Sequence, residues 1–148
     1  VVLNAAPMRR LEENLLKHVD ILIVNQIEAE ALLGHPVATI ADAKAGLRKL
    51  HLPCPTIVVT LGEQGLVYNS SQIPPTHLAA PPVDCISTHG AGDTFVGALC
   101  ARLVGGDDLY AALSYASRAA ALHVSTPFEL RHTIAPEGVE AFARTLDA

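Results

Sequence analysis

The sequence predicts an α/β fold, with a mostly parallel sheet and helices on both of its faces. Three short segments with wholly apolar centres, residues 1–3, 20–24 and 56–60, are separated by stretches with helical periodicity. Strands that are apolar throughout are typical of parallel sheets covered on both sides. Half of the 148 residues are hydrophobic and 17% are charged, so the chain can bury the core that such a fold requires.

Helices and strands alternate through the first half of the chain. Three leucines at helical spacing among charged residues (Leu11, Leu15 and Leu16) predict a helix after the first strand. A second helix is expected over residues 26–33, with Gly34 as its end, and a third over residues 41–50. Residues 65–68 and 76–79 are short strand candidates joined by a turn rich in Asn, Ser and Pro.

The second half is predicted to be helical. A helical pattern begins after Gly92 and ends at the pair Gly105 and Gly106. Asp107 or Asp108 can cap the alanine-rich helix expected over residues 109–123.

Pro136 fits the first turn of a last helix with an apolar stripe. No internal repeat and no long linker divides the sequence, so residues 1–148 are predicted to form one domain. The chain starts on Val1 inside a strand-like run, and we expect it to be the C-terminal part of a larger protein.

Composition excludes several classes of function. The formal net charge is −5 and there is no basic run, which argues against nucleic acid as a partner. No apolar stretch reaches the roughly 20 residues of a membrane-spanning helix. Three cysteines without a C-x-x-C pair fit reduced thiols in a cytoplasmic protein. The seven histidines are scattered and show no metal-ligand spacing.

Gly90, Ala91 and Gly92 have almost no side chain, and a helix is predicted to start among them. Such a start leaves several backbone N–H groups unpaired at the positive end of the helix dipole, which can bind an anion. Asp93 follows in the first turn. A carboxylate beside an anion hole suits phosphoryl transfer, because it can accept the proton of the attacking hydroxyl. The alternative is an ordinary helix start with a capping Asp.

Residues 88–95, read T-H-G-A-G-D-T-F, resemble the signature of the ribokinase-like (PfkB) carbohydrate kinases, D-T-x-G-A-G-D-x-F. The resemblance implies that Asp93 is the catalytic base and that Gly90, Ala91 and Gly92 form the anion hole. The family's leading Asp, which contributes to a monovalent-cation site, is Ser87 in this chain. A neutral hydroxyl holds a hard cation less well than a carboxylate, so we expect little dependence on potassium.

Asn25 and Glu28 stand where a strand passes into a helix. Their spacing is that of an ordinary capping box. It also resembles the N-x-x-E motif of the ribokinase-like family. That resemblance implies that both residues help to place the nucleotide phosphates and Mg²⁺, with Glu28 acting on the metal through water, since magnesium usually keeps several waters.

Thr60, Gly62 and Gly65 belong to the string T-L-G-E-Q-G. A hairpin turn explains this pattern without any ligand. It also resembles the family's T-L-G-x-x-G, which implies that the three residues line the nucleotide phosphates. Glycine allows the backbone to approach a phosphate closely, which gives the pattern a physical reason.

The resemblance covers residues 1–124 and implies ATP-dependent phosphorylation of a hydroxymethyl group of a sugar or related small alcohol. It places Ser117 near the adenine. Residues 125–134 lack the glycine-containing loop of the family, and nothing corresponds to the family's N-terminal half, which carries most sugar contacts. A non-catalytic nucleotide-binding module and a structural α/β domain are the alternatives. The partners expected are ATP, Mg²⁺ and a sugar, without nucleic acid or membrane, and a homodimer is left open.

Overall fold

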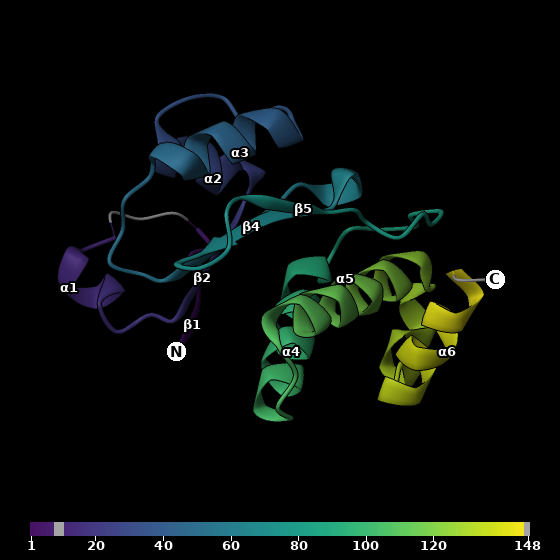
Figure 1. The fold of residues 1–148 in the computed structure, drawn as a ribbon. Helices are drawn as coiled ribbons and strands as arrows, with labels where there is room; N and C mark the ends of the chain where they lie inside the picture. The colour runs from purple at the N-terminus through teal and green to yellow at the C-terminus, as the bar shows by residue number, and fades with distance from the viewer. Residues whose placement is uncertain (8–10, 147–148) are drawn as a thin grey trace. The chain divides into compact units, whose positions relative to one another are not determined.

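The computed structural model of the chain describes residues 1–7 and 11–146 (Figure 1). The chain divides into two compact units, Val1–Ala79 and Ala80–Ala148. Each unit is described by itself, and the expectation of a single domain stays a prediction.

The first unit contains one five-stranded sheet in the order β1-β2-β3-β4-β5. The strands are β1 (Val2–Asn4), β2 (Ile21–Asn25), β3 (Thr56–Thr60), β4 (Leu66–Ser70) and β5 (Thr76–Leu78). β1, β2 and β3 are parallel, whereas β4 is antiparallel to both β3 and β5. The sheet is therefore mixed, and the prediction of a mostly parallel sheet was wrong for its second half. Short connections after β3 and β4 reverse the chain, while the long connections before β3 allow parallel pairing.

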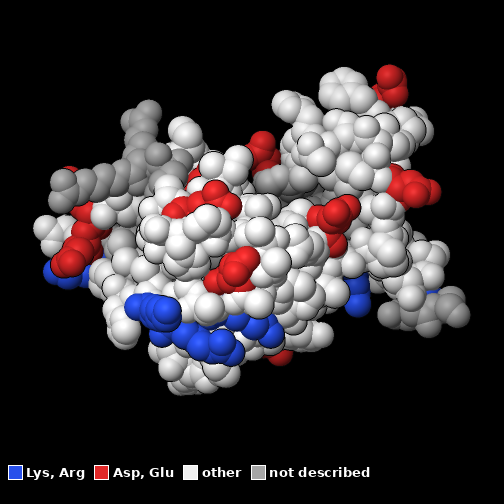
Figure 2. All heavy atoms as spheres, turned by 90° about the horizontal axis from the view of Figure 1, so that it is seen from above, with Lys and Arg blue, Asp and Glu red and all other residues white. Residues whose placement is uncertain are grey.

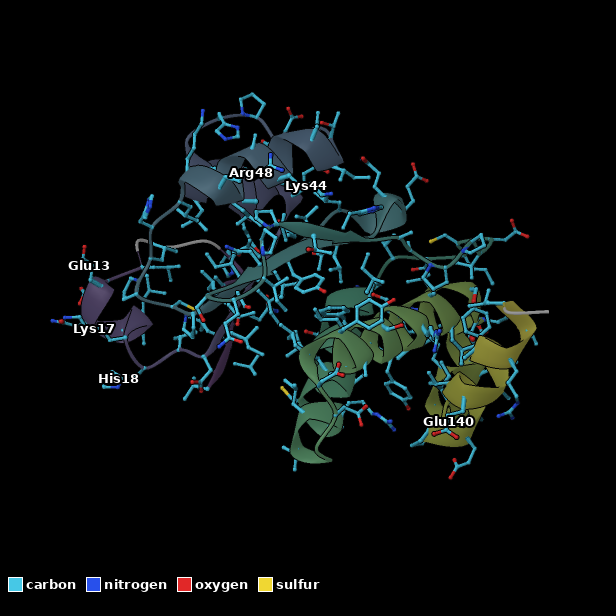
Figure 3. The ribbon with its side chains drawn as sticks, viewed as in Figure 1. Glu13, Lys17, His18, Lys44, Arg48 and Glu140 are labelled. Carbon is cyan, nitrogen blue, oxygen red and sulfur yellow. The ribbon has the colours of Figure 1, made fainter. Side chains whose placement is uncertain are left out.

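Three helices join the parallel strands: α1 (Glu13–Leu16), α2 (Gln26–Leu33) and α3 (Ile40–Lys49). In Figure 1, α2 and α3 lie on one side of the sheet. α3 buries Ala43, Gly46 and Leu47, and Lys44 and Arg48 lie one turn apart on the same helix (Figure 3). The core of this unit consists of apolar side chains from the central strands and from the helices above them, as the hydrophobic pattern predicted.

The second unit is helical, with α4 (Ala91–Val104), α5 (Leu109–Ser125), the 3₁₀ helix η2 (Phe128–Thr133) and α6 (Pro136–Leu146). α4 packs against α5, whose buried face consists largely of alanines, so the two helices can approach closely. Because the two units are described separately, helices on both faces of the sheet stay a prediction.

Arg102 of α4 links three parts of the second unit. Its Nε donates to Asp107 at 2.7 Å, and its guanidinium lies 4.7 Å from the ring centroid of Tyr115. Glu140 of α6, labelled in Figure 3, approaches the same guanidinium at 4.0 Å. The bond to Asp107 and the neighbouring negative charges raise the pKa of Arg102, which is charged in any case.

The charged surface is of mixed sign. Figure 2 shows acidic side chains scattered over one face, with one group of basic side chains and further basic side chains apart from it. Within residues 1–7 and 11–146, no helix has the length and apolar character needed to cross a membrane.

Candidate active site

Two of the sequence motifs meet at the carboxyl ends of two neighbouring strands. Asn25 is the last residue of β2, and Thr60 is the last residue of β3. The two are direct partners across the parallel pair β2–β3. Ligands in open α/β sheets bind beyond the carboxyl ends of the strands. The N-x-x-E and T-L-G-x-x-G motifs therefore lie at the end of the strands where a ligand is expected.

The start of α2 is a complete capping box. The Asn25 side chain accepts the N–H of Glu28 at 2.9 Å, and Oε2 of Glu28 accepts the N–H of Asn25 at 2.9 Å. Glu28 is 5% exposed, so the cap fixes its carboxylate firmly. The interpretation of this motif as a capping box is therefore confirmed. Any role of Asn25 and Glu28 in binding a ligand has to be compatible with their hydrogen bonds in the cap.

The donor set fits an indirect role toward magnesium. Oε1 of Glu28 receives no hydrogen bond from the described residues, and the Asn25 side chain is exposed at the strand end. No group of three or more Asp, Glu, His or Cys residues in the described part of the chain is placed to hold a metal. Magnesium is commonly bound by one or two carboxylates together with phosphates and water, which this arrangement allows.

The turn between β3 and β4 presents bare backbone. Gly62 and Gly65 have φ angles of 59° and 91°, a region that L side chains rarely occupy. A Cβ on Gly62 would find no atom within 4 Å, and the turn closes through the N–H of Leu61 and the carbonyl of Gly65 at 2.8 Å. The turn therefore confirms the predicted hairpin and leaves open space over Gly62 where a phosphate can approach.

The start of α4, in the second unit, is not capped by any side chain. Gly90 has φ of 80°, and its carbonyl accepts the N–H of Thr94 at 3.0 Å. The N–H of Ala91 donates to Thr88 at 3.1 Å, so this amide is already engaged. Within the described residues, the N–H groups of Gly92 and Asp93 have no acceptor, and they are the amides available to an anion.

The Asp93 side chain is exposed and forms no hydrogen bond or ion pair with the described residues. It is the third residue of α4, the position from which an acidic side chain can reach back to the N-cap amide. Asp93 does not do so here, so the alternative of a capping Asp lacks its hydrogen bond. A Cβ on Gly92 would meet nothing within 4 Å, so the space beside Asp93 is open.

Sequence reasoning missed two residues that hold the loop before α4. The Nε2 atom of His123 lies 3.0 Å from the carbonyl oxygen of His89, and Arg131 donates to the carbonyls of Ser87 and His89. A Cβ on Gly90 would approach His123 Nε2 to 2.9 Å, which explains a glycine there beyond its φ angle. These contacts join residues 34 to 44 positions apart, and no local pattern could have indicated them.

Two other predicted positions differ from each other, because Ser87 belongs to this loop and Ser117 does not. Ser87 uses its hydroxyl to accept the N–H of His89 at 3.3 Å. Ser117 is half-buried in the middle of α5. It precedes His123 by six residues, about 9 Å along a helix, and therefore does not take part in the contacts around Gly90.

Comparison with known proteins agrees with these motifs. Residues 1–128 match the model of the pfkB family carbohydrate kinases. The chain is 38% identical over 128 residues to a ribokinase of Staphylococcus aureus, covering 83% of this chain and 41% of the relative. It is 34% identical over 127 residues to a deoxyribokinase of Salmonella typhi, covering 84% and 41%. The chain thus spans about 40% of the length of these relatives.

Solved structures show the same partial coverage. The ribokinase of Arabidopsis thaliana, complexed with ribose and ATP, superposes with a TM-score of 0.84 at 26% identity, covering 95% of this chain and 46% of that one. A putative ribokinase II of Escherichia coli, in complex with ATP and magnesium, gives a TM-score of 0.70 at 29% identity, covering 90% and 42%.

Proposed function

The chain belongs to the pfkB carbohydrate kinase family, and from this we propose that it is the nucleotide-binding and catalytic part of an ATP-dependent kinase. The enzyme transfers the γ-phosphoryl group of ATP to a hydroxymethyl group of a sugar or a related small alcohol. Support for ATP, Mg²⁺ and a sugar comes from the relatives, which were solved with ribose and ATP and with ATP and magnesium. The observation that carries the proposal is the uncapped start of α4 with an unengaged Asp93.

Asp93 is the proposed general base. Its carboxylate accepts the proton of the substrate hydroxyl while the hydroxyl oxygen forms a bond to the γ-phosphorus and ADP leaves. An alcohol is a poor nucleophile until that proton starts to leave. A carboxylate already engaged in a helix cap would be less available as an acceptor, and Asp93 has no such bond to the described residues.

Backbone amides stabilise the charge that develops on the transferred group. The proposed donors are the N–H groups of Gly92 and Asp93, with Gly90 shaping the loop and Ala91 completing its turn. Such preorganised donors act at the positive end of the α4 dipole. Gly92 carries no side chain that could obstruct the phosphoryl group.

Residues of the first unit bind the nucleotide. Thr60, Gly62 and Gly65 approach its phosphates through a turn with open space over Gly62. Asn25 and Glu28 assist magnesium through water. The metal, when bound, neutralises phosphate charge and orients the transferred group. The role of Ser117 near the adenine is proposed on family resemblance alone.

The wider setting is also a proposal. We place the protein in the cytoplasm, because the three cysteines form no disulfide. Residues 1–148 are proposed to act as one domain of a longer enzyme, and a homodimer is compatible with it. Residues that select the sugar are expected in the part of the relatives that this chain does not match.

An assay of ADP release by the full-length protein, with ATP, Mg²⁺ and a panel of pentoses, hexoses and small alcohols, tests the function. We expect turnover with at least one of these acceptors. The isolated 148 residues should show no appreciable turnover. ATP binding by calorimetry without turnover on any acceptor would instead indicate a non-catalytic nucleotide-binding module, and absence of both would indicate a structural domain.

A further inference from the structure

The guanidinium of Arg131 lies among three backbone carbonyls. Its Nη2 donates to the oxygen of Ser87 at 3.0 Å, its Nη1 to that of His89 at 2.9 Å, and its Nε to that of Thr126 at 3.0 Å. All three donors come from one half-buried side chain in η2. Three charge-assisted bonds from one planar group fix both distance and orientation.

These bonds join two segments that are far apart in the sequence. Ser87 and His89 lie within the three residues before Gly90, whereas Thr126 is the C-cap of α5. A second connection lies beside the first, because the N–H groups of Ile86 and Ser87 approach the carbonyl of Val124 at 2.8 and 3.3 Å. The loop before α4 is therefore held next to the C-terminal end of α5 by two sets of bonds. Its N–H groups donate to Val124, and its carbonyls accept from Arg131.

The carbonyl of His89 matters most for the proposed site. It stands four residues before Asp93, so it is the acceptor that the Asp93 N–H would find if the helix continued backwards. The positive φ of Gly90 interrupts the helix there. Nη1 of Arg131 donates to the His89 carbonyl instead, and Nε2 of His123 lies 3.0 Å from the same oxygen. A charged donor binds a carbonyl more strongly than a neutral amide does. The Asp93 amide has no acceptor among the described residues.

We propose that Arg131 is a positioning residue for phosphoryl transfer. It holds the carbonyls of Ser87 and His89 away from the anion-binding amides, and thereby sets the direction of the Gly92 and Asp93 N–H groups. This role rests on the proposed kinase function. It also offsets the negative ends of three carbonyl dipoles close to the loop that binds an anion.

Three variants of the full-length protein test this role. Arg131→Ala removes every bond, and Arg131→Lys keeps the charge but cannot span three carbonyls with a planar fork. Arg144→Ala is the matched control, because Arg144 is an exposed arginine of α6 with no hydrogen bond or ion pair to the described residues. Two readouts are measured well below the unfolding temperature: kcat per folded protein, and amide hydrogen exchange over residues 85–93.

We expect kcat of Arg131→Ala to fall about 10- to 100-fold, the scale of a small misplacement of catalytic groups. Arg131→Lys should lie between it and the unchanged protein. Millimolar guanidinium ion should restore part of the activity of Arg131→Ala, because it can enter the space that the side chain leaves. It should not restore the activity of Arg131→Lys, in which the lysine side chain fills that space. Exchange at Ile86 and Ser87 should become faster in Arg131→Ala and less so in Arg131→Lys, while Arg144→Ala should match the unchanged protein in both readouts.

Two results would overturn the role of Arg131: a kcat of Arg131→Ala within twofold of the unchanged protein, or unchanged exchange over residues 85–93. A failure of the kinase proposal looks different, because the unchanged protein would then show no turnover on any acceptor. In that case, unaltered exchange in Arg131→Ala would still refute the positioning of the loop, and faster exchange would support it.

Discussion

The starts of α3 and α4 use the same kind of residue in opposite ways. Each helix has an aspartate at its third position, Asp42 in α3 and Asp93 in α4. Oδ2 of Asp42 accepts the N–H of Thr39 at 2.9 Å and its hydroxyl at 2.8 Å, and the Thr39 Oγ1 accepts the N–H of Asp42 at 3.2 Å. At α4 the N-cap is Gly90, which has no side chain, and Asp93 reaches back to nothing that the structure describes.

The difference separates a helix start built for stability from one left open. In α3 the carboxylate and the N–H of Asp42 are both bonded to Thr39, and these hydrogen bonds lower the pKa of Asp42. In α4 two amides and a carboxylate stay unengaged within the described residues. Unpaired helix amides are unfavourable unless water or a ligand satisfies them, which fits an anion-binding role.

The largest expected effect comes from removing the basicity of Asp93. Asp93→Asn keeps the size of the side chain, and we expect kcat of the full-length enzyme to fall about 10²- to 10⁴-fold, the usual contribution of a positioned base. ATP affinity should change little, because the nucleotide contacts proposed above are backbone amides and residues of the first unit. Steady-state kinetics and ATP calorimetry measure the two quantities. If kcat stays within a few-fold, Asp93 is not the base.

A smaller effect is expected from adding one methyl group at the open start. Gly92→Ala should lower kcat roughly tenfold, because the methyl occupies the space where the phosphoryl group approaches the amides. Its folding stability should stay equal or rise by up to about 1 kcal/mol, since alanine is the better helix former.

Gly97→Ala provides the matched control for that methyl group. Gly97 lies in the same helix, and a Cβ there also meets nothing within 4 Å. We expect the same effect on stability, measured by chemical unfolding, without loss of kcat. Equal kinetic losses in both variants would mean that α4 is sensitive to any added methyl group and that its start is not special.

The smallest effect is expected at the capped helix. Asp42→Asn should leave kcat unchanged and slightly lower the unfolding temperature at pH 7. The folded-state pKa of Asp42 lies below its ordinary value of about 4, so its carboxylate contributes stability above that pH and loses it as the pH falls through the folded-state pKa. The difference between the variant and the unchanged protein should therefore shrink in thermal scans below about pH 4. A kinetic defect in Asp42→Asn would contradict the comparison.

Much of this fold follows from local patterns in the sequence. The bounds of α2, the Gly34 stop and β3 were predicted residue by residue, because apolar periodicity and glycine act locally. Asp108 was one of two predicted caps for α5 and is the one observed, at 2.8 Å from the N–H of Ala111. The hairpin after β3 was predicted from its glycines, but the share of antiparallel pairing in the whole sheet was underestimated. Strand direction depends on how a connection closes in space rather than on the strand itself.

The candidate site was predictable only where its residues are close in sequence. The motif around Gly90 and the Asn25 cap were found from spacing, and pairing of Asn25 with Thr60 required the structure. The bonds of Arg131 cross more than 40 residues to the carbonyls of Ser87 and His89. A carbonyl belongs to every residue type, so no sequence pattern could mark these acceptors.

Backbone amide signals of the full-length enzyme, followed by NMR during a titration with ADP, Mg²⁺ and aluminium fluoride, test the open start of α4 most directly. The fluoride complex stands in for the transferred phosphoryl group. The account predicts saturable shifts at the amides of Gly92 and Asp93, and none at the Asp42 amide, which is already bonded to Thr39. Formation of the complex, seen as shifts at Gly62, with no change at Gly92 and Asp93 would contradict it.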